Sequence, residues 1–178
     1  MDYIISDLRS HFSYAYMTSS GYIAICIMVV FFLIVGVLLP GRKTADKICI
    51  AILFLYMFGV YSLTVLMRDS RYLDRSVVVV PFRWFTMWKE TGKVTMAWLA
   101  LENFIMLIIP GVSLGYLFRR FGFIRRILSA TLLMAFFSMT IEYTQFVLNI
   151  GVCELDDIIC NTAGALVGAF LSLLVRDR

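Results

Sequence analysis

The sequence has 178 residues, of which 61% are hydrophobic and only 16% are charged, with a formal net charge of +4. A soluble domain has about 25% charged residues, and so little polar material cannot cover the apolar surface of a chain this long. The composition therefore excludes a soluble globular protein and predicts an all-α integral membrane protein. In such a chain the small positive charge reflects loops that set orientation, and it does not indicate a nucleic-acid partner.

The apolar runs predict the number and position of the membrane spans. Several runs exceed the roughly 18 residues that are needed to cross a bilayer core. Residues 1–21 are polar and aromatic and lack the features of a signal peptide, so we expect an external N-terminal segment. Residues 22–178 are expected to form one transmembrane domain, a polytopic bundle of about five helices. The predicted spans are 22–39, 48–67, 98–118, 127–150 and 158–175.

Basic residues in the short connections predict the orientation of the chain. They lie between the first two spans, between the third and fourth, and in the tail, and comprise Arg42, Lys43, Lys47, Arg119, Arg120, Arg125, Arg126, Arg176 and Arg178. Short basic loops are cytoplasmic, and five spans place all three groups on one side. We therefore expect the N-terminus outside and the C-terminus in the cytoplasm.

The connection 68–97 has internal organisation. Val77–Val80 should be extended, because the residue before Pro81 is disfavoured in helical conformation. Aromatic residues that include Trp84 and Trp88 then alternate with basic residues such as Arg83. This mixture beside a span predicts a segment that lies in the headgroup layer. The alternative is an aromatic belt that only anchors the fold.

Polar residues recur at one depth in the last three spans, where charged groups are costly and usually have a use. Glu142, Gln145 and Asn149 share one helical face, and Glu142 lies about 12 Å from the span end at about 1.5 Å per residue. Polar groups in lipid must be satisfied internally, so we expect one outward-open pocket with Arg68 or Arg71 at its mouth. The residues expected to line this pocket are Glu102, Glu142, Asp157 and Asn161, and Asn103, Gln145 and Asp156 are also expected to bind the ligand.

The role of these acids has alternatives. Glu142 fits structural pairing, ligand capture or catalysis, and the spacing does not separate the three. Asp156 and Asp157 begin the last span, where an acid is favoured by the helix macrodipole, so each could also be a cap. If the site were catalytic, Glu142 and Asp157 would be the candidates, because burial can separate the pKa values of two carboxylates.

Other features have packing explanations. Pro110 followed by Gly111 should kink the third span, and Gly164 with Gly168 should allow close helix approach. The four cysteines lack CxxC spacing and the chain has a single histidine, so we expect no metal site and no cofactor.

Several blocks resemble the VanZ-like family, whose namesake lowers sensitivity to the glycopeptide teicoplanin. They are Arg68 followed by Pro81-Phe82, then Glu102-Asn103 leading through FIMLIIPG, then Ser138, Ile141-Glu142 and Gln145, and the most specific, GVCELDDIICNTAGA from Gly151 to Ala165. The resemblance covers roughly Ile48 to Val175. The chain departs from many members at Val80, where asparagine is usual, and at Val152-Cys153-Glu154, where an arginine often follows the glycine. The resemblance implies a small multi-helix protein of Gram-positive cell envelopes and no settled activity.

Three functional hypotheses follow. In the first, a non-enzymatic envelope protein binds an amphiphile, a lipid-linked wall precursor or a lipoglycopeptide antibiotic, at the outer leaflet and contributes to teicoplanin resistance. Arg68, Arg71 and Arg83 would meet anionic groups, the polar residues of the pocket would bind amide, sugar or amine groups, and Trp84 and Trp88 would hold the acyl region. The alternatives are an intramembrane enzyme acting on a lipid carrier and a small transporter. Membrane lipids are the expected partners.

Overall fold

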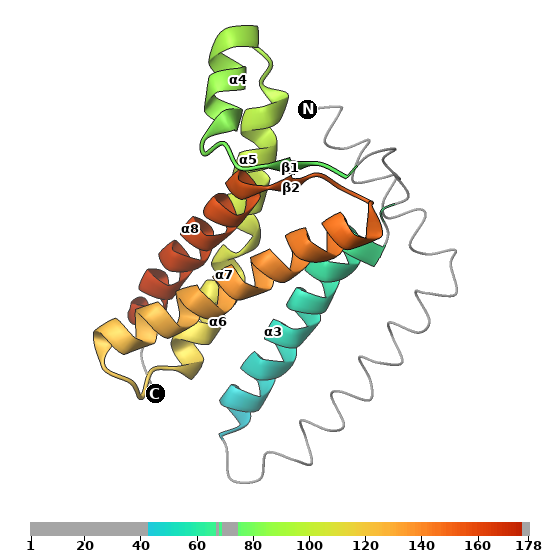
Figure 1. Cartoon of the computed structure of the whole chain (residues 1–178). Coiled ribbons are helices and arrows are strands. Elements are labelled where there is room, and N and C mark those ends of the chain that lie inside the picture. Colours follow the sequence, from blue (N-terminus) through green and yellow to red (C-terminus); the bar gives the residue numbers. More distant parts are fainter. Residues whose placement is uncertain (1–42, 67, 69–74, 176–178) are drawn as a thin grey trace. The chain divides into compact units, whose positions relative to one another are not determined.

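The computed structural model describes residues 43–66, 68 and 75–175. The chain forms two compact units, Met1–Asp69 and Ser70–Arg178, and each is described by itself (Figure 1). The expected external segment 1–21, the expected first span 22–39 and Arg71 all lie outside the described residues.

The first unit contains one long apolar helix. α3 (Thr44–Tyr61) continues into a π-helical turn, η1 (Ser62–Leu66). It begins four residues before the predicted span start at residue 48, because the polar residues of its first turn are also helical. In this wider turn the Thr64 hydroxyl donates a hydrogen bond to the Val60 carbonyl at 2.8 Å. A side chain thus supplies a donor to a backbone carbonyl. Thr44–Leu66 is long and apolar enough to cross a membrane.

The second unit is a helical bundle. It comprises α4 (Arg83–Thr91), α5 (Thr95–Met106), α6 (Ile108–Leu117), α7 (Phe123–Leu148), α8 (Leu155–Leu171) and a final 3-10 turn, η2 (Ser172–Leu174). α8 packs against α5, α6 and α7 (Figure 1). Thr95–Leu117, Phe123–Leu148 and Leu155–Leu174 are candidate spans, so the described part of the chain holds four in all. The protein is therefore a multi-pass membrane protein.

Glycines explain how closely α8 approaches its neighbours. A Cβ atom at Gly164 would overlap the backbone carbonyl of Phe104 in α5, and one at Gly168 would overlap that of Ile108 in α6. Gly111 stands in the same relation to the Ala165 carbonyl. Backbone therefore lies against backbone along this interface, which is the packing predicted for the two α8 glycines.

The expected third span is broken into α5 and α6. The interruption is at Leu107, where φ is −98° and ψ is 7°. Pro110 lies three residues further on, and because proline has no N–H it leaves the carbonyl of Met106 without its helical donor. The predicted kink is thus present, and the chain resumes a helix in which the Gly111 N–H donates to the Leu107 carbonyl at 3.0 Å.

A small sheet joins the connection before α4 to the segment after α7. β1 (Val77–Val78) pairs in parallel with β2 (Cys153–Glu154), with Val77 opposite Cys153 and Val78 opposite Glu154 (Figure 1). The extended conformation of Val77–Val78 agrees with the expectation from Pro81. The pairing partner was not predicted, so the all-α description is incomplete at this point. The helical periodicity of the sequence does not indicate that two residues pair as a strand with a distant segment.

At the other end of the bundle, a hydrogen-bonded contact joins α7 to the end of α8. The Arg126 guanidinium donates from Nη2 to the Ser172 carbonyl at 2.7 Å and to its Oγ at 2.9 Å. A Cβ at Gly115 would overlap the same serine side chain, so α6 also packs closely here.

Candidate functional site

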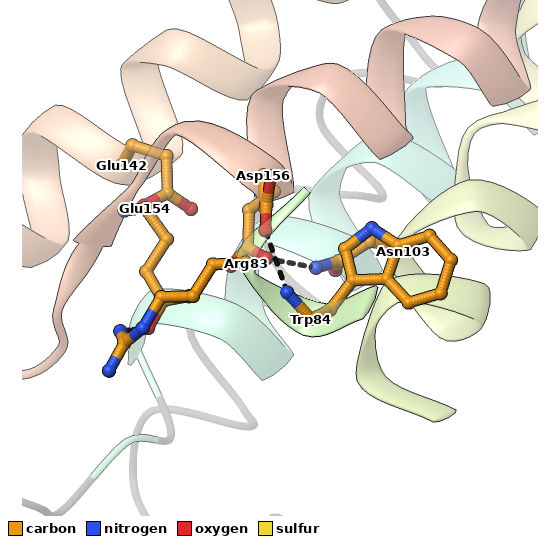
Figure 2. A network of polar contacts seen from close by, with 7 residues as sticks. Arg83, Trp84, Asn103, Glu142, Glu154 and Asp156 are labelled. Carbon is orange, nitrogen blue, oxygen red and sulfur yellow. Dashed lines mark hydrogen bonds and ion pairs between the residues drawn. The ribbon is translucent and has the colours of Figure 1, made fainter. Parts of the chain in front are cut away.

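Most of the polar residues predicted from the sequence gather where α7 ends and α8 begins. The segment between these helices contains β2, and α4 and the first half of α5 lie at the same end of the second unit (Figure 1). Figure 2 shows the polar contacts that connect these elements.

Asp156, in the first turn of α8, holds the beginning of α4. Its buried carboxylate accepts the backbone N–H of Phe82 through Oδ1 at 2.5 Å. It also accepts the backbone N–H of Trp84 through Oδ2 at 3.1 Å (Figure 2). Phe82 precedes α4 and has a left-handed backbone, with φ of 57°. The carboxylate therefore supplies the acceptors that an N-terminal capping residue usually provides, and its charge favours this helix end. Asp156 was expected from its position to be a possible cap of the last span, but in the structure it caps α4.

Asp157, the next residue, connects α8 to α5. Its Oδ1 accepts a hydrogen bond from Nδ2 of Asn103 at 2.7 Å. Asp157 and Asn103 are both half-buried, whereas Glu102, adjacent to Asn103 in the chain, is exposed on α5. Of this predicted pair, it is Asn103 that meets Asp157.

Glu142 connects α7 to β2. Its side chain is only 3% exposed, and Oε2 accepts the backbone N–H of Glu154 at 2.9 Å. Gln145 is buried one turn later on α7. Asn149 takes a left-handed conformation with φ of 57° just after the helix, so it ends α7 instead of continuing the polar face.

A second polar contact lies deeper between α7 and α8. The Nδ2 of Asn161 donates to the Ser138 hydroxyl at 2.9 Å, and both side chains are buried. Asn161 lies one helical turn beyond Asp157, as its spacing predicted. The Asp157–Asn103 contact and the Asn161–Ser138 contact therefore lie one helical turn apart along α8.

Charged and aromatic side chains lie on the outer side of this network. Arg83 begins α4, and its Nη1 lies 4.0 Å from Oε1 of Glu154, with side chains 40% and 32% exposed (Figure 2). No residue of α4 is buried, and Phe85 and Trp88 are 47% and 43% exposed. Trp84 is half-buried and packs edge-to-face with Phe85 at 5.7 Å between ring centroids.

The pKa of the Cys153 thiol is affected by two of the predicted acids. Burial, and then the negative charges of Glu142 and Asp157, raise the pKa of Cys153 above its ordinary value. Both carboxylates therefore act on one thiol in β2, so the two predicted catalytic candidates lie on the same side of the bundle. Among the described residues, no group of three or more His, Cys, Asp or Glu side chains could hold a metal ion.

The arginines predicted to meet anionic groups have different outcomes. Arg83 lies at the network, Arg68 is exposed in the first unit, and Arg71 is outside the described residues. Two contributors, Glu154 and Arg75, were not among the predicted site residues. Arg75 donates from Nη2 to the Val147 carbonyl at 3.2 Å and so helps to satisfy the end of α7. Three acids within four residues after a span were the available signal for Glu154.

The geometry divides the polar residues into two kinds. Glu142, Asp156 and Asp157 each accept a hydrogen bond from another segment of the second unit and so join its elements. Arg83 and Glu154 keep their charged ends at the surface, beside exposed aromatic rings.

Comparison with known proteins adds one match. Residues 22–176 match the model of the family described as VanZ/LLP1. No curated protein and no solved structure matches the chain.

Proposed function

The chain belongs to the VanZ/LLP1 family, and from this premise we propose that it is a non-enzymatic envelope protein that binds an amphiphile. The ligand is a lipid-linked wall precursor or a lipoglycopeptide antibiotic, bound at the α4 end of the second unit. This end faces the outer leaflet, and binding contributes to teicoplanin resistance.

The observation that carries the proposal is the exposed Arg83 beside exposed aromatic rings. A guanidinium presents five N–H donors in a geometry that suits phosphate and carboxylate oxygens. Phe85 and Trp88, on the same helix, offer apolar surface at half exposure. A cationic group next to such surface matches an amphiphile with an anionic headgroup.

The position of α4 supports a ligand in the membrane. Three residues separate its last residue, Thr91, from the start of α5 at Thr95. This connection reaches about 14 Å at most, so α4 stays close to the end of an apolar span. Aromatic and basic side chains at that level are typical of the headgroup layer.

Binding is favoured over catalysis by the partners of the acids. Both oxygens of Asp156 accept backbone N–H groups, Asp157 accepts the Asn103 amide, and Glu142 accepts the Glu154 N–H. A general acid and base need a proton-transfer path to a substrate, and these oxygens are directed at structural donors. The acids that sequence reasoning assigned to the ligand thus fit a positioning role better.

The proposal is tested by native mass spectrometry of the purified protein and by drug sensitivity. Anionic amphiphile should remain bound to the wild type and be lost from Arg83→Gln. Lys89→Gln is the matched control, because it removes one exposed positive charge from the same helix. Expression of the wild type should raise the teicoplanin concentration that inhibits a sensitive host, and Arg83→Gln should remove that effect. Retained binding and protection in Arg83→Gln would disprove the proposal.

A further inference from the structure

The Arg83 and Glu154 side chains form an incompletely satisfied charge pair. At 4.0 Å the separation of Nη1 and Oε1 exceeds that of a hydrogen bond. Within the described part of the chain, neither charged group makes another polar contact. The donors of the guanidinium and the acceptors of the carboxylate are thus open to a ligand.

Both residues are nevertheless held in place through their backbones. Asp156 accepts the N–H groups of Phe82 and Trp84, which flank Arg83 in the chain. Glu142 accepts the N–H of Glu154 itself. The backbone segments that carry the two charged side chains are therefore held by buried carboxylates that contact neither charged end. Because these backbone segments are already ordered, a ligand that binds here has to order only the two side chains.

The pair contributes little to folding, so replacing it carries a small penalty. Exposed ion pairs are weak even at good geometry, because water already solvates both partners. A ligand with one negative and one positive group could satisfy both side chains at once. A purely anionic ligand would use Arg83 but would face the Glu154 carboxylate at close range.

We propose that the Arg83–Glu154 pair selects amphiphiles whose headgroup is zwitterionic, with a phosphate for Arg83 and a primary ammonium for Glu154. The inference rests on the proposed function and names the ligand class of the same site. A primary ammonium has three N–H donors for the carboxylate, whereas a quaternary ammonium has none. Phe85 and Trp88 contact the adjoining apolar part of the ligand.

Titration of the purified protein in detergent, followed by native mass spectrometry, tests this selection. The probes are phosphatidylethanolamine, phosphatidylcholine and phosphatidylglycerol with identical acyl chains. The wild type should bind phosphatidylethanolamine about tenfold more tightly than phosphatidylcholine, because only the primary ammonium can donate charged hydrogen bonds to the Glu154 carboxylate. Glu154→Gln should lose this preference and keep binding phosphatidylglycerol, whereas Arg83→Gln should weaken binding of all three.

The controls separate failure of this inference from failure of the proposed function. Glu90→Gln removes an exposed acid from α4, the helix of Arg83, and should leave the preference unchanged. Glu154→Gln keeps the backbone N–H that Glu142 accepts. Equal affinity for the first two lipids, or an unchanged preference in Glu154→Gln, overturns the inference alone. Absence of Arg83-dependent binding of any lipid overturns the proposed function as well. Soluble glycerophosphoethanolamine should compete poorly, and competition at the lipid's own affinity would overturn the amphiphilic ligand class.

Discussion

The Oδ2 atom of Asp156 accepts the backbone N–H of Trp84 at 3.1 Å across 72 residues of sequence. Its other oxygen accepts the N–H of Phe82, the residue that precedes α4. Helices are usually capped by a polar side chain just before their first turn, and phenylalanine has none to offer. The start of α4, and with it the placement of Arg83, therefore depends on a carboxylate that belongs to α8.

Asp156→Asn should loosen α4 while leaving the bundle folded. Asparagine keeps a single acceptor oxygen, so one of the two N–H groups loses its partner, at roughly 1–3 kcal/mol. Amide hydrogen exchange across 82–91 should accelerate by about tenfold or more. Asp157→Asn is the control, because Asp157 contacts Asn103 on α5. Unchanged exchange in Asp156→Asn would show that α4 does not depend on this carboxylate.

Glu142 should tolerate an amide better than an apolar side chain. Glu142→Gln retains an oxygen that can accept the Glu154 N–H, whereas Glu142→Leu leaves this N–H without its acceptor. We expect Glu142→Leu to lose roughly 1–3 kcal/mol of unfolding free energy and Glu142→Gln to lose clearly less. Thermal or detergent-induced unfolding of the purified variants measures the difference. If the glutamine variant folds normally but loses ligand binding, the charge of Glu142 is needed as well as its hydrogen bond.

Gly164→Ala should separate α8 from α5. The added Cβ would overlap the backbone carbonyl of Phe104, which cannot move aside as a flexible side chain can. Overpacking of this kind costs about 1–3 kcal/mol or more. Gly122→Ala is the matched control, because the space around that glycine is open and its φ is −59°. A lowered midpoint of thermal unfolding is expected for Gly164→Ala alone, and equal midpoints would contradict the close packing.

The broad fold followed from apolar runs because the length of a span is set by the bilayer. The helix starts differ from prediction because hydropathy omits polar first turns: α8 begins at Leu155 and includes Asp156 and Asp157, where residue 158 was expected. The pairing of β1 with β2 could not be predicted, since neither two-residue strand has a periodic pattern.

The site was also predictable in part, from the contrast between polar residues and an apolar chain. Polar residues in an apolar chain stand out, and their helical spacing placed Glu142 and Asp157 at one end of the bundle. Their partners did not stand out, because Glu142 and Asp156 accept backbone N–H groups, which every residue except proline carries. The sequence left structural pairing, ligand capture and catalysis open for Glu142, and the backbone N–H that this acid accepts favours a structural role. The Arg83–Glu154 pair depends on the approach of α4 to β2, which no local pattern encodes.

The Cys153 thiol should react slowly near neutral pH. Burial and the charges of Glu142 and Asp157 raise its pKa, so the reactive thiolate forms only at higher pH than in a free cysteine. Because folding raises the pKa of the Cys153 thiol, the protonated thiol favours the folded state. This contribution to the free energy of unfolding is present below the pKa of the thiol in the unfolded chain, and it is lost as the pH rises through the pKa in the folded protein. Iodoacetamide labelling against pH, with Cys26, Cys49 and Cys160 replaced by serine, measures the profile. Glu142→Gln should shift it to lower pH, and an unmoved profile would place that carboxylate away from the thiol.

The site should face the outside of the cell. α7 runs through 26 residues from Phe123 to Leu148, about 39 Å at 1.5 Å per residue, and so separates the two ends of the second unit by a bilayer thickness. The turn before α7 and the first turn of α7 carry four arginines, and short basic loops remain in the cytoplasm. In a cysteine-free background, a membrane-impermeant maleimide applied to intact cells should label Lys93→Cys, between α4 and α5. It should label Gly122→Cys only after permeabilisation. The reverse pattern would place Arg83 and Glu154 in the cytoplasmic leaflet and exclude a ligand taken from the outer surface.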